Sequence, residues 1–249
     1  MNQAQKYLFD LQGYLVLENL LPADFVEGCN RILEKLEAAP PQAYPEGVVQ
    51  SKPRTNNELY LSNILQADPL LHRLIDIPEV IDVINEVSRG LFRLNHTYSI
   101  SHWGDGYTYL HMGGTPIHPK ASYTCANGQI FSLLTKAVFP IRNHGVDDGC
   151  FAVIPGSHKA NFERPWGNHP AENPPLVPVP AKPGDVIVFT EALAHGSVVN
   201  VSGRTRRTIY CCYSVGYMPD WTKLHLTFSK SFIEQVSPER REILRLKID

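Results

Sequence analysis

The sequence predicts a mainly β protein, a β-sandwich or barrel with helices packed on its outside. Segments with apolar residues at helical spacing dominate residues 2–88, whereas β-branched and aromatic runs separated by turn residues dominate the chain after Gly90. The 249 residues, 43% of them hydrophobic, suffice for one domain with a full core. We expect a single domain over 1–249, with N-terminal helices of about residues 2–88 packed on the β core.

The N-terminal part is expected to combine helices with one short strand. Gly13 separates the first helix from a short apolar run, and Pro22 begins a helix because its missing N–H is not needed there. A segment rich in proline and asparagine then predicts a loop. In chain order the expected elements are a helix at 2–10, a strand at 14–17, a helix from Pro22, a loop at 40–56 and helical segments at 59–65 and 78–87.

The remainder of the chain is expected to form strands, because turn residues such as Asp147-Asp148-Gly149 separate its apolar runs. Residues 160–175 contain four prolines and predict a surface loop over one mouth of the sheets. A helix is expected near Pro238–Leu246. The predicted strands are Leu91–Trp103, Tyr107–His111, Gln129–Ile141, Phe151–Ile154, Asp185–Phe189 and Arg207–Tyr217.

Composition excludes several classes of function. The formal charge is −2, which gives no electrostatic reason to bind nucleic acid or an anionic membrane, and no apolar run is long enough to cross a membrane. The N-terminus is not a convincing signal peptide. The five cysteines form no zinc pattern, so we expect reduced thiols and a cytoplasmic protein. The sequence carries no signal for an oligomeric state.

Two segments of the chain predict a metal site. The first is LHMGG, at 110–114, and the second runs over 184–213. Residues i and i+2 of a strand share a face, so a histidine and a carboxylate at this spacing can supply two ligands, and a distant histidine a third. Iron(II) held in this way keeps open positions for a co-substrate and oxygen. His111 is the candidate for the first histidine and His195 for the last.

A candidate anion anchor follows the second histidine. Arg206 lies on the strand after His195, and an arginine that points into a barrel can hold a carboxylate through two hydrogen bonds. Ser197 can add a hydrogen bond to the same carboxylate. Arg204 and Arg207 flank Arg206, and Arg207 must face the opposite side from it if the strand is regular.

Three segments resemble the phytanoyl-CoA dioxygenase family of iron(II)- and 2-oxoglutarate-dependent oxygenases. They are FDLQGYLVLENLLPADFVEGC, DDGCFAVIPGSHK and GDVIVF…HGSVVN…R, within a similarity that covers about residues 5–222. The resemblance implies a double-stranded β-helix (a jelly roll of the cupin type), His195 as a metal ligand, Arg206 as the 2-oxoglutarate anchor and Ser197 as its helper. LHMGG and FTEALAHG also resemble an uncharacterised bacterial branch that carries LHGG and FTEALTHG, which implies no substrate.

One position departs from that family. Its metal motif is His-x-Asp, whereas this chain has Gly113 in place of the aspartate. In related halogenases a small residue at this place leaves room for chloride on the iron. Alternatively, two protein ligands and water hold the metal, or a carboxylate comes from elsewhere, with Glu191 and Asp105 as candidates. Loss of iron chemistry is a further possibility.

We therefore expect an oxygenase that uses iron(II), 2-oxoglutarate and O2 to hydroxylate an aliphatic C–H bond of a small molecule. In this hypothesis His111 and His195 bind iron, Arg206 and Ser197 bind 2-oxoglutarate, and Gly113 determines what fills the remaining position. The alternatives are a halogenase that uses chloride at the position opened by Gly113, a non-catalytic binding module on the same fold, and a cupin-type hydrolase or isomerase that works without 2-oxoglutarate. The identity of the substrate is not encoded in any motif that we recognise.

Overall fold

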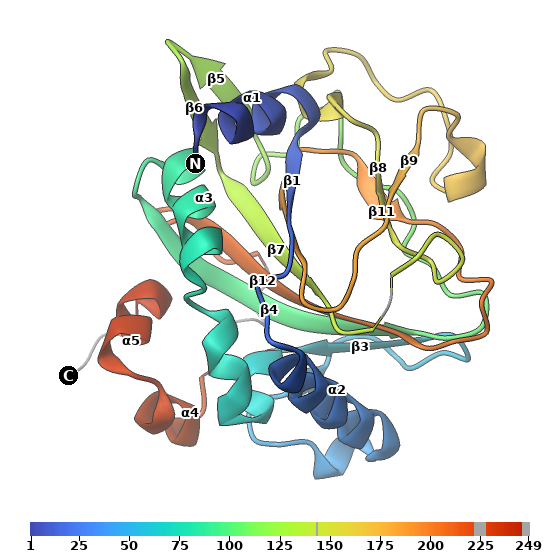
Figure 1. Cartoon of the computed structure of the whole chain (residues 1–249), viewed down its shortest axis with the longest axis vertical. Coiled ribbons are helices and arrows are strands. Elements are labelled where there is room, and N and C mark those ends of the chain that lie inside the picture. Colours follow the sequence, from blue (N-terminus) through green and yellow to red (C-terminus); the bar gives the residue numbers. More distant parts are fainter. Residues whose placement is uncertain (143, 222–227, 246–249) are drawn as a thin grey trace.

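A computed structural model describes residues 1–142, 144–221 and 228–245. Its largest element is an antiparallel sheet of seven strands in the order β1-β10-β7-β12-β4-β3-β2 (Figure 1). Long central strands with β-branched and aromatic residues explain why this sheet forms the frame of the molecule. The strands are β1 (Tyr14–Leu17), β2 (Val49–Gln50), β3 (Glu58–Ser62), β4 (Phe92–His102), β7 (Leu134–Pro140), β10 (Val186–Thr190) and β12 (Arg206–Val215).

A smaller sheet of three strands, in the order β11-β8-β9, lies across from the large one (Figure 1). Its strands are β11 (His195–Ser197), β8 (Phe151–Val153) and β9 (Val177–Val179), and a separate hairpin joins β5 (Tyr123–Ala126) to β6 (Gln129–Ser132). Two facing antiparallel sheets with helices outside confirm the mainly β class and the double-stranded β-helix expected from the sequence.

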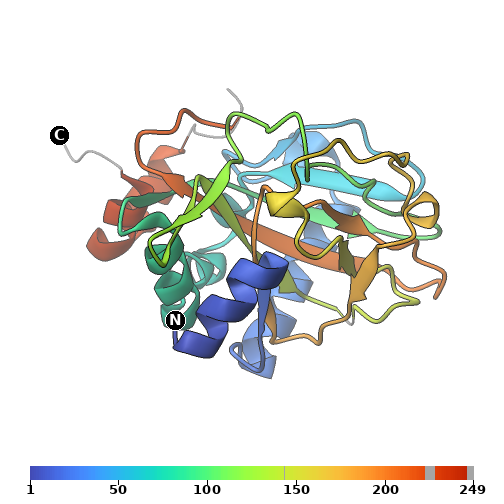
Figure 2. The same cartoon turned by 90° about the horizontal axis from the view of Figure 1, so that it is seen from above.

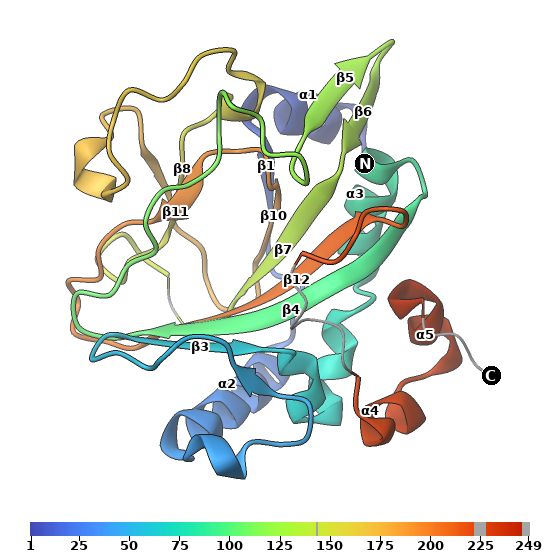
Figure 3. The same ribbon diagram turned by 180° about the vertical axis from the view of Figure 1, so that it is seen from behind.

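The helices lie on the outer face of the large sheet. In Figure 3, α2, α4 and α5 are on one side of β4 and β12, and the small sheet is on the other. The buried face of α3 packs in the same helix-side cluster. A capping box at Asn2 and a left-handed Gly13 bound the first helix, which explains why it is a separate unit before β1. The helices are α1 (Gln3–Gln12), α2 (Ala23–Ala38), α3 (Pro78–Ser88), α4 (Lys230–Gln235) and α5 (Pro238–Leu244).

Alternation along the strands separates two buried clusters. On β12, Ile209 and Cys211 pack with the helices, whereas Tyr210 and Cys212 face the small sheet. The pairing of β12 with β4 is interrupted by a bulge between Cys212 and Tyr213, so that Asn95 of β4 has no residue directly opposite it. The alternation of β4 side chains between the two faces of the sheet shifts by one residue at this point. The space between the two sheets is therefore lined by alternate residues of the long strands, and any functional group on that parity points into it.

Three expectations about elements are wrong. Residues 59–65 are not a helix, because Glu58–Ser62 forms β3, with Leu59 and Leu61 buried at a spacing of two, and only Ile64–Ala67 turns as a short 3-10 helix. Residues 107–110 are not a strand, and the β-bridge of this segment lies at His111. The run at 129–141 is divided into β6 and β7 at Leu133.

The other predicted elements agree within a few residues. The proline-rich segment at 160–175 is an outer loop with one short 3-10 turn at Pro170–Glu172 (Figure 2). The last helix ends at Leu244, and its predicted end at Leu246 is outside the described residues because residue 246 is not described. All five cysteines are free thiols. In the described ranges, no helix combines the length and apolar character that a membrane crossing requires.

Buried histidines predict a marked acid sensitivity. Burial lowers the pKa of His102 and His158 to about 4 and that of His144 to about 3. A histidine whose folded pKa is depressed stabilises the fold above the unfolded pKa of about 6.5 and loses that contribution as the pH falls. At pH 5 each of the three is expected to cost about 2 kcal/mol of unfolding free energy relative to pH 7.5. Urea unfolding at both pH values measures this loss.

The matched control for this prediction is His158→Gln. This variant should lose about 2 kcal/mol less than the wild type over the same pH interval. An unfolding free energy that does not change between pH 7.5 and pH 5 in the wild type contradicts the prediction.

Candidate metal and co-substrate site

His111 and His195 are brought together by a backbone pairing between the segment that follows β4 and strand β11. Each donates its backbone N–H to the carbonyl of the other at 3.1 Å, in an isolated antiparallel bridge that extends β11. Their imidazole rings therefore lie side by side, with centroids 4.1 Å apart and planes at 58°. The two histidines predicted as metal ligands share one site.

Both rings present the same nitrogen to the site. Nδ1 of His111 lies 3.0 Å from the carbonyl of Tyr109, and Nδ1 of His195 lies 2.7 Å from the carbonyl of Leu193. A carbonyl only accepts, so each Nδ1 carries the proton and each Nε2 keeps its lone pair. This is the orientation in which a histidine binds a metal while its backbone contact fixes the ring.

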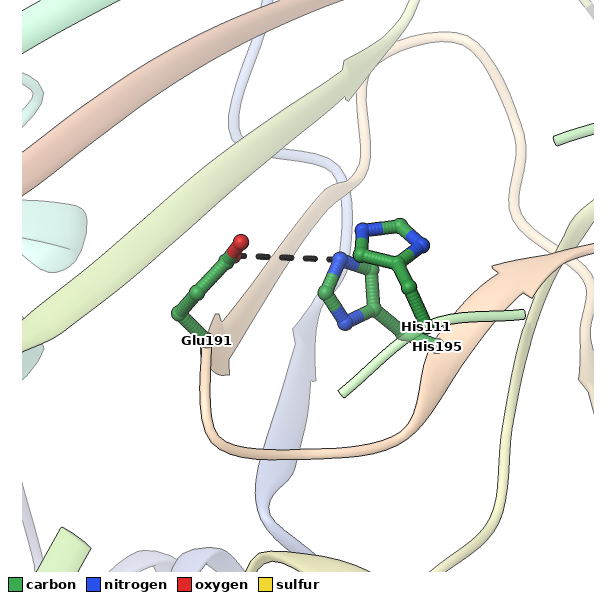
Figure 4. Close-up of side chains that lie close together, drawn as sticks. All are labelled: His111, Glu191 and His195. Carbon is green, nitrogen blue, oxygen red and sulfur yellow. Dashed lines mark ion pairs between the residues drawn. The ribbon is translucent and has the colours of Figure 1, made fainter. Parts of the chain in front are cut away.

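Glu191 supplies a carboxylate to the same site. It lies directly after β10, in the short crossing that leads from the large sheet to β11 and His195. Its Oε2 is 3.7 Å from Nε2 of His195, and Figure 4 shows the carboxylate directed at both imidazole rings. Glu191 is only 1% exposed, so this carboxylate is removed from solvent.

The carboxylate is balanced by a buried lysine. Lys136, on the inward-facing parity of β7, places its Nζ 2.7 Å from Oε2 of Glu191 and 3.3 Å from the hydroxyl of Tyr98. Burial alone would lower the pKa of this ammonium, but the attraction and hydrogen bond of Glu191, together with nearby Cys212 and Tyr210, outweigh it and raise the pKa of Lys136. The pair can remain charged because each member neutralises the other.

The two imidazoles are neutral in this environment. Burial is the largest cause that lowers the pKa of His111, and it lowers the pKa of His195 well below its ordinary value, with the neighbouring His111 adding to the effect. Neutral imidazole is the form that binds metals. The electrostatics of the site therefore keep both ring nitrogens available at neutral pH.

The donor set of this site fits a divalent first-row metal. Among the histidine, cysteine, aspartate and glutamate side chains in the described part of the chain, one group of three has all its ligand atoms within 4.8 Å of one another. It consists of His111, Glu191 and His195. Ligand atoms around one such ion lie about 3 Å apart, so small rotations of the side chains suffice to close the site. Two imidazole nitrogens and one carboxylate are the donor set of non-haem iron(II) oxygenases.

Asp105, the other candidate for a third ligand, is not in this group. It is exposed, and it accepts a hydrogen bond from Nδ2 of Asn57 at 3.3 Å. Within the residues that the structure describes, the carboxylate grouped with the histidine pair is that of Glu191.

Gly113 occupies a turn with no space for a side chain. Met112, Gly113 and Gly114 all have positive φ, so the segment after His111 leaves the strand conformation in which residues i and i+2 share a face. A Cβ at Gly113 would lie 2.5 Å from Cβ of Ala194 and 2.9 Å from its backbone nitrogen. A side chain at this position would start against Ala194 rather than in open space.

The substitution Gly113→Ala is expected to lower the unfolding free energy by about 2–4 kcal/mol, from left-handed strain and the collision with Ala194. Denaturant unfolding of the metal-free protein measures it. Gly128→Ala, at a positive-φ glycine with no atom near its Cβ, is the matched control and should lose only the cost of the strain. Equal losses in the two variants contradict a packing role for Gly113.

Arg206 and Arg207 are held in opposite ways on the two faces of β12. Arg207 faces α2, where Glu34 and Glu37 bind its guanidinium at 3.2 and 2.7 Å. Arg206 points into the space between the sheets, is 2% exposed and, among the residues that the structure describes, binds only the carbonyl of Gly149 and Nδ1 of His102. Its Nε is buried without a partner among the described residues. Arg206 is thus a buried cation held by neutral acceptors, which suits a carboxylate ligand.

Ser197 lies two residues after His195 on β11, so the two side chains share a face of the strand. Its Oγ accepts a hydrogen bond from the backbone N–H of Thr108 at 2.8 Å, which leaves its hydroxyl hydrogen available to donate. Register places Ser197 opposite Phe151, two residues from the Gly149 carbonyl that binds Arg206. Arg206 thus reaches from the large sheet to a carbonyl close in sequence to the strand that pairs with Ser197 in the small sheet.

A cavity of about 390 Å³ opens onto the metal-ligand group, since both His111 and Glu191 line it. Aromatic rings form a large part of its wall: Tyr98 stacks in nearly parallel planes on Tyr60 and on Tyr210, at 4.9 and 4.4 Å between centroids. Such rings offer flat apolar faces with polar edges to a small molecule. The cavity is the natural place for a substrate next to the candidate metal.

Several residues of this site were not identified from the sequence, namely Glu58, His102, Lys136 and the aromatic wall. The sequence signal that could have found them is the alternation of inward- and outward-facing side chains along a strand. Residues 98, 100 and 102 of β4 alternate with outward-facing ones, as do residues 134, 136 and 138 of β7, but which parity faces inward depends on the pairing of the strands.

Comparison with known proteins places this arrangement in context. The family model described as phytanoyl-CoA dioxygenase matches residues 9–208. A probable phytanoyl-CoA dioxygenase of Caenorhabditis elegans is 23% identical over 95% of this chain and 82% of its own length. Dioxygenase lolE1 of Epichloe uncinata is 31% identical, over 28% of this chain and 29% of its own.

Solved structures show the same fold. HygX of Streptomyces hygroscopicus, solved with nickel, 2-oxoglutarate and hygromycin B bound, superposes with a TM-score of 0.77 at 22% identity, over 89% of this chain and 90% of that one. The epimerase SnoN from nogalamycin biosynthesis has a TM-score of 0.65 at 17% identity, over 89% and 84% of the two chains. At these identities the likeness establishes the fold.

Proposed function

Because this chain belongs to the phytanoyl-CoA dioxygenase family, we propose that it uses iron(II), 2-oxoglutarate and O2 to hydroxylate an aliphatic C–H bond of a small molecule. The observation that carries the proposal is the convergence of two imidazoles and a carboxylate, of which His111 and Glu191 line the cavity. That HygX was solved with 2-oxoglutarate and a small molecule supports the same choice of co-substrate.

In this proposal His111, His195 and Glu191 hold the iron. The two Nε2 atoms donate their lone pairs because backbone carbonyls hold the Nδ1 protons, and Glu191 takes the place of the carboxylate that Gly113 cannot supply. Bound iron(II) with 2-oxoglutarate would activate O2, with 2-oxoglutarate oxidised to succinate and CO2. Lys136 keeps the Glu191 carboxylate in place and balances its charge.

Arg206 and Ser197 orient the co-substrate. The buried guanidinium would bind the distal carboxylate of 2-oxoglutarate through two charge-assisted hydrogen bonds, and the hydroxyl of Ser197 would donate a third. The aromatic wall of Tyr60 and Tyr98 excludes water from the opposite side of the cavity and holds the substrate near the metal.

The contact of Gly113 with Ala194 argues for hydroxylation over halogenation. A halide site would require the space at Gly113 to open onto the metal, whereas this glycine packs against Ala194 and a carboxylate from Glu191 stands beside the histidines. A third protein donor leaves no position that a chloride ion must fill.

The test is an anaerobic titration of metal-free protein with iron(II) and 2-oxoglutarate, with and without chloride, followed by the visible charge-transfer band. The proposal expects a band that is the same in both conditions. A band that shifts with chloride makes halogenation the function instead. The absence of a band in both conditions overturns the oxygenase proposal and leaves a binding module or a cupin-type enzyme that works without 2-oxoglutarate.

A further inference from the structure

A row of three polar side chains crosses the inner face of the large sheet. Glu58 on β3 lies directly opposite His102 on β4, and His102 lies directly opposite Arg206 on β12. All three positions have the parity that faces the small sheet, as Tyr60 and Tyr210 do on the same strands. Their side chains are therefore cross-strand neighbours that point into the same space.

Hydrogen bonds join the row from end to end. Oε2 of Glu58 lies 3.0 Å from Nε2 of His102, and Nδ1 of His102 binds Nη2 of Arg206. A guanidinium can only donate, so Nδ1 of His102 accepts and carries no proton. The ring proton is then on Nε2, where it is donated to the Glu58 carboxylate. Glu58 fixes the tautomer in which His102 can hold Arg206.

The charge of each member is consistent with this arrangement. His102 is fully buried, and burial followed by the nearby Arg206 lowers its pKa to about 4, so that the ring is neutral at pH 7. The hydrogen bond from His102 lowers the pKa of Glu58, which is therefore a carboxylate. The row places a neutral imidazole between an anion and a cation.

The separation of the Glu58 carboxylate from the Arg206 guanidinium affects how Arg206 can bind an anionic ligand. Arg207 is neutralised directly by Glu34 and Glu37, whereas among the described residues no carboxylate touches the guanidinium of Arg206. A glutamate in direct contact would compete with an anionic ligand for the same N–H groups. His102 holds the guanidinium without offering a competing negative charge.

We propose that Glu58 and His102 are positioning residues for the 2-oxoglutarate anchor, with His102 holding the guanidinium of Arg206 in the orientation that accepts a carboxylate and Glu58 fixing the His102 tautomer. The inference rests on the proposed function, because it takes 2-oxoglutarate as the ligand of Arg206. The opposite end of the row reaches the substrate side, since Glu58 also lines the cavity of about 390 Å³.

The experiment measures Kd for 2-oxoglutarate by anaerobic calorimetry on the iron(II)-loaded protein, and Kd for iron(II) separately. His102→Leu and Glu58→Leu are expected to weaken 2-oxoglutarate binding about tenfold or more and to leave iron binding within about twofold, because each removes a hydrogen-bond partner from a buried group. Glu58→Gln keeps an acceptor for the Nε2 proton and should stay within about threefold of the wild type.

A second readout separates orientation from general damage. Oxaloacetate is one carbon shorter than 2-oxoglutarate, so a correctly placed guanidinium discriminates between the two acids. The ratio of their Kd values should approach one in His102→Leu and Glu58→Leu. His72→Leu, which replaces a buried histidine packed against Phe232 on the helix side, is the matched control and should retain the wild-type ratio.

The possible failures can be told apart. If the wild type does not bind 2-oxoglutarate, the proposed function itself is overturned. If it binds 2-oxoglutarate equally after Arg206→Ala, the assignment of Arg206 as the anchor is overturned, and the positioning roles with it. If the wild type binds through Arg206 but folded His102→Leu and Glu58→Leu variants keep both the Kd and the ratio, only the positioning roles are overturned. Should His102→Leu not fold, the partly exposed Glu58→Leu, whose side chain is 23% accessible in the wild type, decides the question alone.

Discussion

Replacement of Arg206 by alanine is expected to raise the Kd for 2-oxoglutarate by about 100-fold or more. The guanidinium is buried and held by neutral acceptors, so its removal deletes the charge that a buried carboxylate ligand would pair with, and loss of one partner of such a pair costs about 3–5 kcal/mol. Anaerobic calorimetry with the iron(II)-loaded protein measures the change.

Two variants define the interpretation of this result. Arg206→Lys keeps the charge but loses the two-pronged geometry, and it should give an intermediate Kd. Arg204→Ala removes an exposed arginine that binds the buried carboxylate of Asp148, and it should bind 2-oxoglutarate as the wild type does. If the activity of Arg206→Ala is fully restored at high 2-oxoglutarate, the anchor affects binding alone; an unchanged Kd contradicts the assignment.

Replacement of Glu191 by glutamine is expected to weaken iron(II) binding by more than about 100-fold. Loss of a direct ligand should exceed the 10–100-fold effect of losing a partner of a ligand. Titration of the metal-free protein with iron(II) under anaerobic conditions, in competition with a chelator, provides the measurement. Asp105→Asn is the matched control, since Asp105 is an exposed carboxylate outside the histidine group.

The loss of Glu191 has a second effect that must be separated from the first. Lys136 would be left as a buried charge without its partner at 2.7 Å, which destabilises the fold. The double variant Glu191→Gln/Lys136→Met removes both charges and is expected to regain stability but not iron affinity. Wild-type iron affinity in either variant contradicts the assignment of Glu191 as the third ligand.

The sequence predicts those parts of this molecule that depend on local pattern. The helices bounded by Gly13 and Pro22 form where spacing and end signals indicate, and β4, β10 and β12 occur within a few residues of the expected strands. The prediction of a helix at 59–65 was wrong because the apolar residues of this segment suit both a helix and a strand. Pairing with β4 decides between the two.

The site divides along the same line. Motif spacing and the family resemblance were enough to select His111, His195 and Arg206, and the structure brings the two histidines into one group and points Arg206 inward. The role of Glu191 was left open because its direction depends on how the chain crosses from β10 to β11. The row of Glu58, His102 and Arg206 joins three distant strands and depends on their exact register, which no local pattern encodes.

The crossing from β10 to β11 carries two of the three proposed metal donors within a single short stretch of chain. The loop that follows His111 therefore supplies no metal donor, whereas a His-x-Asp motif would require one from it. That loop can change in length or composition without removing a metal donor, whereas an insertion between Glu191 and His195 would alter the spacing of two donors at once. Divergence toward new substrates, in nature or in the laboratory, is expected to accumulate in the segment after His111 and to spare the crossing.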